Sequence, residues 1–127
     1  MKKAEYKALL DEWKIRLGLY DWHIKLYPKC KPEEMAMEDV AGCSSWEETI
    51  KTARIDILNP KYYGNRLIKF DWEKTLVHEL LHLKLCLVSD KVDEFQGRYM
   101  HQIIDDLARA LIDAKRFEKE REGKGGK

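Results

Sequence analysis

The segment His78-Glu79-Leu80-Leu81-His82 holds the residues of this chain whose types and spacing could do chemistry. On a helix, residues four apart lie one turn apart on the same face, so the two imidazoles can bind one cation. The carboxylate of Glu79 can reach a water on that cation without becoming a ligand. Zinc lowers the pKa of such a water from about 15.7 towards 7, and Glu79 would accept its proton as hydroxide attacks a carbonyl carbon. The segment therefore predicts a zinc-dependent hydrolase.

A core helix with two hydrogen-bonded histidines is the alternative explanation of this pattern. With four histidines in 127 residues, the pattern arises by accident on the order of once in a hundred such chains. The flanking residues Val77, Leu80, Leu81, Leu83 and Leu85 are apolar. Burying two unpartnered imidazoles beside a carboxylate in such surroundings is costly, and a metal ion removes that cost. We therefore favour zinc bound by His78 and His82.

The third ligand does not follow from the most familiar extension of the motif. That extension requires a histidine at position 88 and a glycine at position 85, where this chain has Val88 and Leu85. The metzincin pattern and the three-histidine pattern of YbeY-type endoribonucleases are both absent. We therefore expect the third ligand to come from the final helix.

The geometry of a helical hairpin ranks the candidates on that helix. If two antiparallel helices turn at residues 89–90, the level midway between His78 and His82 lies roughly 3 Å along the axis from His101. Helical side chains lean towards the N-terminus of their own helix, which brings the His101 ring back towards this level. Glu94, about 7 Å to the other side, leans away and is the alternative third ligand.

The favoured ligand set is His78, His82 and His101, with the nearby aspartates as the least favoured replacements for His101. Three protein ligands leave one tetrahedral vertex open to water, which is typical of a catalytic zinc site. Asp105 follows His101 by one turn, and it could hydrogen-bond the far nitrogen of that ring and fix its tautomer. An exposed helical acid is the more common explanation of such a residue.

Hydrophobic periodicity places these residues in an α+β fold. Apolar residues recur at helical spacing in an N-terminal helix, in the motif helix and in a long C-terminal helix, while alternation of period two marks strands. The predicted helices are 3–17, 71–88 with Asp71 as N-cap, and 89–118 with Ser89-Asp90 as cap; the predicted strands are 22–28, 40–46 and 50–58. Residues 47–49 can connect a hairpin, which favours a three-stranded, mostly antiparallel sheet.

Length and composition predict one domain over residues 1–120, followed by a flexible charged tail at 121–127. Hydrophobic residues make up 44% of the chain and charged residues 37%, with a formal net charge of +1. A chain so close to neutral needs no polyanionic partner, so we expect no nucleic acid partner.

The compartment expected from the sequence is the cytoplasm. No apolar run approaches the roughly 18 residues that span a bilayer, and the N-terminal residues contain no signal-peptide core. The three cysteines, Cys30, Cys43 and Cys86, include no Cys-x-x-Cys pair. Neither a disulfide framework nor a zinc ribbon is therefore predicted.

Two segments, Leu17–Leu26 and Thr75–Leu83, resemble the minimal zincin metallopeptidases. They are most similar to small metallopeptidase-like proteins of phages and prophages, which are relatives of the SprT-like and ImmA/IrrE-like groups. The resemblance implies a zincin-like fold, zinc bound by His78 and His82, and Glu79 as general base. It also implies a third ligand on the last helix, which in many of these relatives is a glutamate.

The resemblance further implies a protein or peptide substrate that adds as a strand to the edge of the sheet. Ile50–Leu58 is the expected edge, and a phage or prophage origin of the chain is compatible with the resemblance.

Two other functions remain open from the sequence. One is a non-proteolytic zinc-binding module that acts through a partner, and the other is a zinc hydrolase of another bond, including the phosphodiester bond. Tyr62, Tyr63 and Tyr99 are conceivable donors to a tetrahedral oxyanion, and none is assigned. His23 lies on the polar face of a strand and is interpreted as a solvent-facing or hydrogen-bonded histidine.

Overall fold

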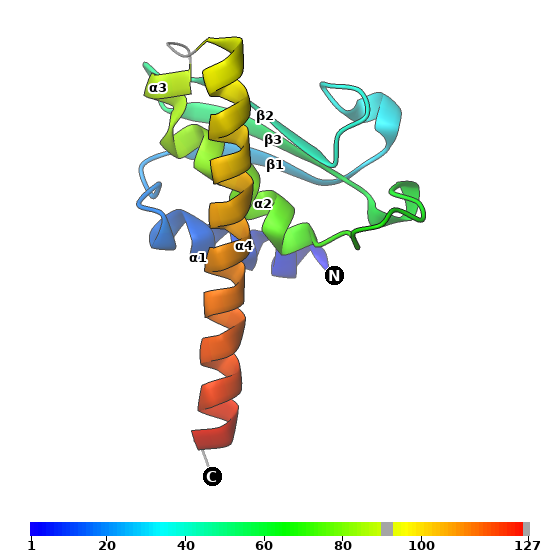
Figure 1. The fold of residues 1–127 in the computed structure, drawn as a ribbon, viewed down its shortest axis with the longest axis vertical. Helices are drawn as coiled ribbons and strands as arrows, with labels where there is room; N and C mark the ends of the chain where they lie inside the picture. Colours follow the sequence, from blue (N-terminus) through cyan, green and yellow to red (C-terminus); the bar gives the residue numbers. More distant parts are fainter. Residues whose placement is uncertain (90–92, 126–127) are drawn as a thin grey trace.

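The chain folds as an N-terminal helix, a three-stranded sheet and a C-terminal group of helices (Figure 1). The computed structural model describes residues 1–89 and 93–125. In chain order the elements are α1 (Lys3–Arg16), β1 (His23–Cys30), η1 (Pro32–Glu34), β2 (Gly42–Glu47), β3 (Thr52–Leu58), η2 (Pro60–Tyr62), α2 (Trp72–Lys84), α3 (Cys86–Ser89) and α4 (Glu94–Gly125). The predicted α+β class is confirmed.

The sheet is mixed, with the strand order β1-β3-β2. Strands β2 and β3 form the predicted antiparallel hairpin, whereas β1 pairs with β3 in parallel. The prediction of a mostly antiparallel sheet is therefore wrong for one of its two strand pairs. The reason is the connection 31–41, which carries the chain to the far edge of the sheet and leaves β3 in the centre.

This strand order also corrects the predicted docking edge. Both sides of β3 (Thr52–Leu58) are already hydrogen-bonded to neighbouring strands. An added strand therefore has no free backbone groups to pair with along Ile50–Leu58. The edges of the sheet are β1 and β2.

Strand β1 continues past Pro28, where the sequence predicted its end. The pairing of β1 with β3 is irregular between Tyr27 and Cys30. Proline has no backbone N–H to donate, but an edge strand with such an irregularity accommodates it. The strand therefore reaches Cys30.

Helix α2, which carries the motif, lies between the sheet and α4 (Figure 1). It begins after Asp71, whose side chain accepts a hydrogen bond from the backbone N–H of Lys74 at 3.2 Å, so the predicted N-cap is confirmed. Leu76, Val77 and Leu80 are completely buried. The helix ends at Lys84, earlier than predicted, and residues 86–89 form the separate α3.

Helix α4 begins later than the sequence suggested. Asp93 precedes it, accepting a hydrogen bond from the backbone N–H of Gln96 at 2.7 Å, while the Gln96 side chain accepts one from Asp93 N–H at 3.3 Å. This reciprocal pair is a capping box. Of the predicted cap, Ser89 belongs to α3 and Asp90 lies outside the described residues. At the other end α4 continues to Gly125, so the predicted tail is helical over 121–125, and 126–127 lie outside the described residues.

Apolar residues occupy two faces of α4, and only one of these faces is covered. Ile104, Ala108 and Ile112 are buried in the core. Four further large apolar residues, spaced four apart, are 44–64% exposed: Phe95, Tyr99, Ile103 and Leu107. Among the helices of the described chain, none combines the length and apolarity that a membrane span requires.

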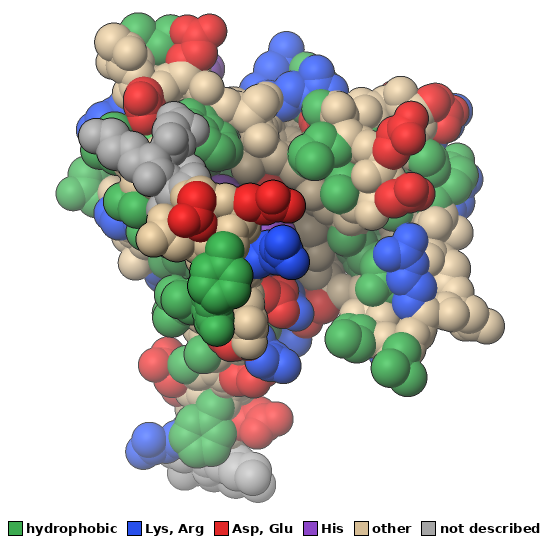
Figure 2. Space-filling model, turned by 45° about the horizontal axis from the view of Figure 1, so that its top comes forward, with side chains coloured by type: hydrophobic (Ala, Val, Ile, Leu, Met, Phe, Trp, Pro, Cys, Tyr) green, Lys and Arg blue, Asp and Glu red, His purple; other side chains and the backbone are tan. Residues whose placement is uncertain are grey.

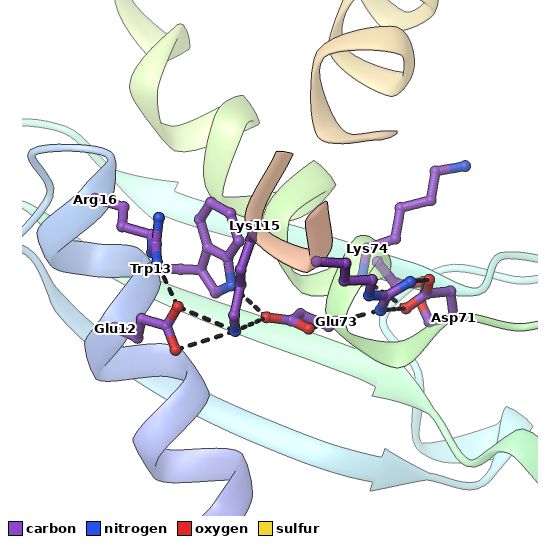
Figure 3. A network of polar contacts seen from close by, with 9 residues as sticks. Glu12, Trp13, Arg16, Asp71, Glu73, Lys74 and Lys115 are labelled. Atoms are coloured by element: carbon purple, nitrogen blue, oxygen red, sulfur yellow. Dashed lines mark hydrogen bonds and ion pairs between the residues drawn. The ribbon is translucent and has the colours of Figure 1, made fainter. Parts of the chain in front are cut away.

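An ion-pair network around the buried Lys115 fixes the C-terminal half of α4 to α1 and α2 (Figure 3). Lys115, only 4% exposed, forms ion pairs with Glu12 of α1 at 3.0 Å and with Glu73 of α2. The indole N–H of Trp13 donates to Glu73 at 2.7 Å. Arg116 donates two hydrogen bonds to Asp71 at the start of α2. The network therefore holds the three long helices together at one end of the α2–α4 pair.

Replacing Lys115 should destabilise the fold strongly. Lys115→Met keeps most of the side-chain volume but leaves Glu12 and Glu73 without their shared cation, at an expected cost of about 3 kcal/mol. The control is Arg109→Met, which removes an exposed ion pair with Asp106 and should cost about 0.5 kcal/mol or less. Urea denaturation of both variants measures the difference, and equal losses would contradict this account of the network.

Candidate metal centre

Three histidines from two helices converge at one place between α2 and α4. His78 and His82 come from α2 and His101 comes from α4. One ring nitrogen of each lies within 4.8 Å of the corresponding nitrogens of the other two. Ring centroids are 4.7 Å apart for His78 and His101, and 5.4 Å apart for His82 and His101. The three imidazoles are therefore close enough to bind a single metal ion.

The spacing within the α2 pair suits a tetrahedral ion. The Nε2 atoms of His78 and His82 lie 3.3 Å apart. Zinc–nitrogen bonds of about 2.0–2.1 Å at tetrahedral angles hold two ligand nitrogens about 3.3 Å apart. The pair thus already has the separation that a tetrahedral zinc ion requires.

A carboxylate on α4 fixes the orientation of one ring. Nδ1 of His78 lies 3.3 Å from Oδ1 of Asp105, and Nζ of Lys74 lies 3.3 Å from the same oxygen. Because Asp105 accepts the hydrogen bond, the Nδ1 of His78 carries the proton and its Nε2 keeps the lone pair that a metal needs. The sequence suggested this role for Asp105 but directed it at His101, whereas in the structure the partner is His78.

Burial keeps the two α2 histidines neutral. It lowers the pKa of His82 to about 4, with further lowering by the charges of His78 and His101. Burial is also the main cause that lowers the pKa of His78, and the charge of His101 adds to it. Metal binding at neutral pH therefore has no proton to displace from these two rings.

Glu79 is turned about 100° around the axis of α2 from His78, towards β2, and it lines the same cavity as His78 and His101. It is 6% exposed. Burial raises its pKa to about 7, while a hydrogen bond from the Ser44 side chain acts in the opposite direction. A carboxyl group with a pKa near neutrality can both accept and return a proton at physiological pH.

Gly42 of β2 lets the sheet approach Glu79 closely. A Cβ atom at this position would lie 2.7 Å from Cγ2 of Thr75 and 3.2 Å from Oε2 of Glu79. Any side chain here would push the strand away from α2 or displace the carboxylate. A glycine at position 42 is thus required by the packing around Glu79.

The structure also locates the other candidate residues. Glu94, the alternative third ligand, is 89% exposed and forms an ion pair with Arg98 at the start of α4. His23 is exposed on β1. Of the three tyrosines, only Tyr63 lines the cavity that contains His78 and His101. Within residues 1–89 and 93–125, the three histidines form the group that is close enough to hold a metal ion, and their role as ligands stays a prediction.

Sequence reasoning missed two residues of this site. Lys74 precedes His78 by one helical turn, so the helical spacing alone could have indicated its proximity. Ser44 lies on a different element, and no local pattern connects it with Glu79.

Comparison of this chain with models of protein families, with curated proteins and with solved structures gave no match.

The three histidines should bind one divalent metal ion per chain. His78→Ala, His82→Ala and His101→Ala should each weaken Zn²⁺ binding by at least about 100-fold, because each removes a ligand. His23→Ala is the matched control, and its affinity should equal that of the wild type. Calorimetric titration and elemental analysis measure affinity and stoichiometry. Full zinc occupancy in His101→Ala would exclude that residue as a ligand.

Gly42→Ala should destabilise the protein by about 2 kcal/mol through overpacking against α2. Thr75→Ser removes the methyl group that the new Cβ would approach at 2.7 Å and keeps the hydroxyl. The double variant should be more stable, by at least about 1 kcal/mol in the free energy of unfolding, than the sum of the two single effects predicts.

The control for this cycle is Gly123→Ala, where a new Cβ would meet open space. This change in a helix should be neutral or slightly stabilising. Strict additivity of the Gly42 and Thr75 substitutions in denaturation experiments would mean that the close approach imposes no constraint.

Proposed function

We propose that this protein is a zinc-dependent metallopeptidase with a zincin-like fold. The observation that carries the proposal is the convergence of His78, His82 and His101 beside a buried carboxyl group, that of Glu79. Three imidazoles that leave one tetrahedral vertex open are typical of catalytic zinc, whereas structural zinc sites have four protein ligands. Sites with imidazole ligands also bind other first-row transition metals. Elemental analysis of the purified protein identifies which metal is bound.

The roles of the residues follow from where each side chain lies. A zinc ion, when bound, would supply an acidified water and polarise the scissile carbonyl group. The carboxylate of Glu79 would accept the proton of that water and pass it to the departing amine nitrogen. Asp105 holds the ring of His78 so that its Nε2 faces Nε2 of His82.

The edge strand β2 is the proposed place of substrate binding. It lies at an edge of the sheet, and its residues Gly42 and Ser44 contact Glu79. A peptide that paired with this edge would run past the side of α2 on which the carboxyl group lies.

We also propose that the protein acts in the cytoplasm. Within the described part of the chain the three cysteines form no disulfide, and Cys30 and Cys43 are buried thiols. Such cysteine usage is compatible with a reducing compartment.

Replacing Glu79 should separate catalysis from metal binding. Glu79→Gln should bind zinc as the wild type does and lower peptide hydrolysis by about 1,000-fold, because it removes the general base. Glu118→Gln, the same isosteric change at an exposed position of α4 far from β2, is the control and should remain fully active. Incubation with unfolded proteins followed by mass spectrometric detection of new N-termini gives the measurement.

Two outcomes would contradict the proposal. One is zinc-loaded wild type that cleaves no peptide bond under any condition tested, which would favour a non-catalytic zinc-binding module. The other is a Glu79→Gln variant that cleaves as fast as the wild type.

A further inference from the structure

A cavity of about 340 Å³ opens beside the three histidines. His78, Glu79 and His101 contribute to its lining. The rest of the lining includes residues 40–42 and residues of the segment between η2 and α2. The space-filling view shows the surface hollowed between α4 and the lobe that carries these two connections (Figure 2). The volume is large enough for one bulky side chain with part of its neighbour.

One wall of this cavity is apolar. Tyr63 packs edge-on against Phe70 with ring centroids 5.1 Å apart, which makes a continuous aromatic surface. Ile68 continues this wall and is 68% exposed. An apolar surface that is left open beside a polar site is typical of a contact for an apolar ligand group.

Besides Glu79, the cavity is lined by two carboxylates, Asp71 and Asp105, and each already has a cationic partner. Asp71 accepts hydrogen bonds from Arg116 at 2.8 and 3.0 Å. Asp105 forms an ion pair with Lys74 and also accepts a hydrogen bond from the neutral ring of His78. Although burial opposes the effect, these partners lower the pKa of both aspartates. Both are therefore ionised and internally compensated.

Lys69 is the contrasting case. It lies in the cavity lining between Ile68 and Phe70, and its side chain is exposed. In the part of the chain that the structure describes, no hydrogen bond or ion pair engages Lys69. The cavity thus presents an uncompensated positive charge at the end of an apolar wall.

We infer that this cavity selects peptides in which a bulky apolar residue is adjacent to an acidic residue, with Lys69 as the group that recognises the acid. The inference rests on the proposed peptidase function and names its substrate class. The apolar side chain would cover Ile68 and the Tyr63–Phe70 pair. The neighbouring carboxylate would pair with the Lys69 ammonium group, whereas a basic residue there would meet like charge.

The test is a binding experiment that needs no cleavage. Zinc-loaded Glu79→Gln protein is titrated with three fluorescent peptides of equal sequence, except that one phenylalanine is flanked by Asp, Asn or Lys. The Asp peptide should bind about tenfold tighter than the Lys peptide at low salt. Adding Lys69→Glu should abolish or reverse this preference. Adding Lys61→Glu, the same charge change on η2 away from this cavity, should leave it unchanged.

The outcomes separate the inference from the proposed function. An unchanged Asp-to-Lys preference in the Lys69→Glu variant, or no binding of any of the three peptides, would overturn the inference. If wild-type protein with zinc binds the peptides with the expected preference but cleaves none of them, the peptidase proposal fails and the recognition by Lys69 stands.

Discussion

The packing of α4 against α2 is the interaction on which the candidate site depends. Helix α2 alone supplies two imidazoles, and two ligands do not hold a zinc ion firmly. The antiparallel neighbour adds the third imidazole, His101, and the carboxylate of Asp105 that orients His78. At the far end of the same helix pair, Lys115 lies buried between carboxylates of α1 and α2. The geometry of the three histidines is therefore set by the position of a whole helix that is anchored more than three turns away from His101.

The rotation of the α-helix divides the chemistry of the motif between two faces of α2. Consecutive residues are about 100° apart around the axis, so Glu79 cannot share the face of His78. The histidines face α4, while Glu79 faces β2, where Gly42 allows close approach and Ser44 donates a hydrogen bond. The two neighbours therefore contribute differently, since α4 completes the cluster of three histidines and the sheet desolvates the carboxyl group of Glu79. A motif of five residues needs both neighbours to become a site.

The sequence predicted the parts of this structure that local patterns determine. The motif helix with its Asp71 cap, the β2–β3 hairpin and the approach of His101 all follow from spacing, capping and helical geometry. Long-range pairing follows from none of these patterns. Whether β1 lies beside β2 or β3 depends on the path of the connection 31–41, and its composition carries no signal of that path.

The apolar pattern of α4 does not by itself determine which of its residues the rest of the fold covers. Ile103 and Ile104 are equally apolar, but Ile104 is completely buried and Ile103 is 53% exposed. Hydrophobic periodicity indicates that a helix has an apolar face. It does not indicate how much of that face the rest of the fold covers. The start of α4 was misplaced for a related reason, because Asp90 and Asp93 both offer a side chain suited to capping and only the Gln96 partner distinguishes Asp93.

The cavity is lined on one side by residues of helices α2 and α4 and on the other by residues of two connections. The helical residues are held by the packing of α2 and α4. The connections, residues 31–41 and 59–71, are tied to the core at few points. One such point is Asp56 of the central strand, which is 1% exposed and accepts hydrogen bonds from Ala36 N–H at 3.2 Å and from Arg54 at 2.8 Å. It ties the connection 31–41 to β3, and this connection leads directly into the wall at residues 40–42. Residues on such connections change at little cost to stability, so the lining of the cavity can vary while the three histidines and the buried carboxyl group of Glu79 stay as they are.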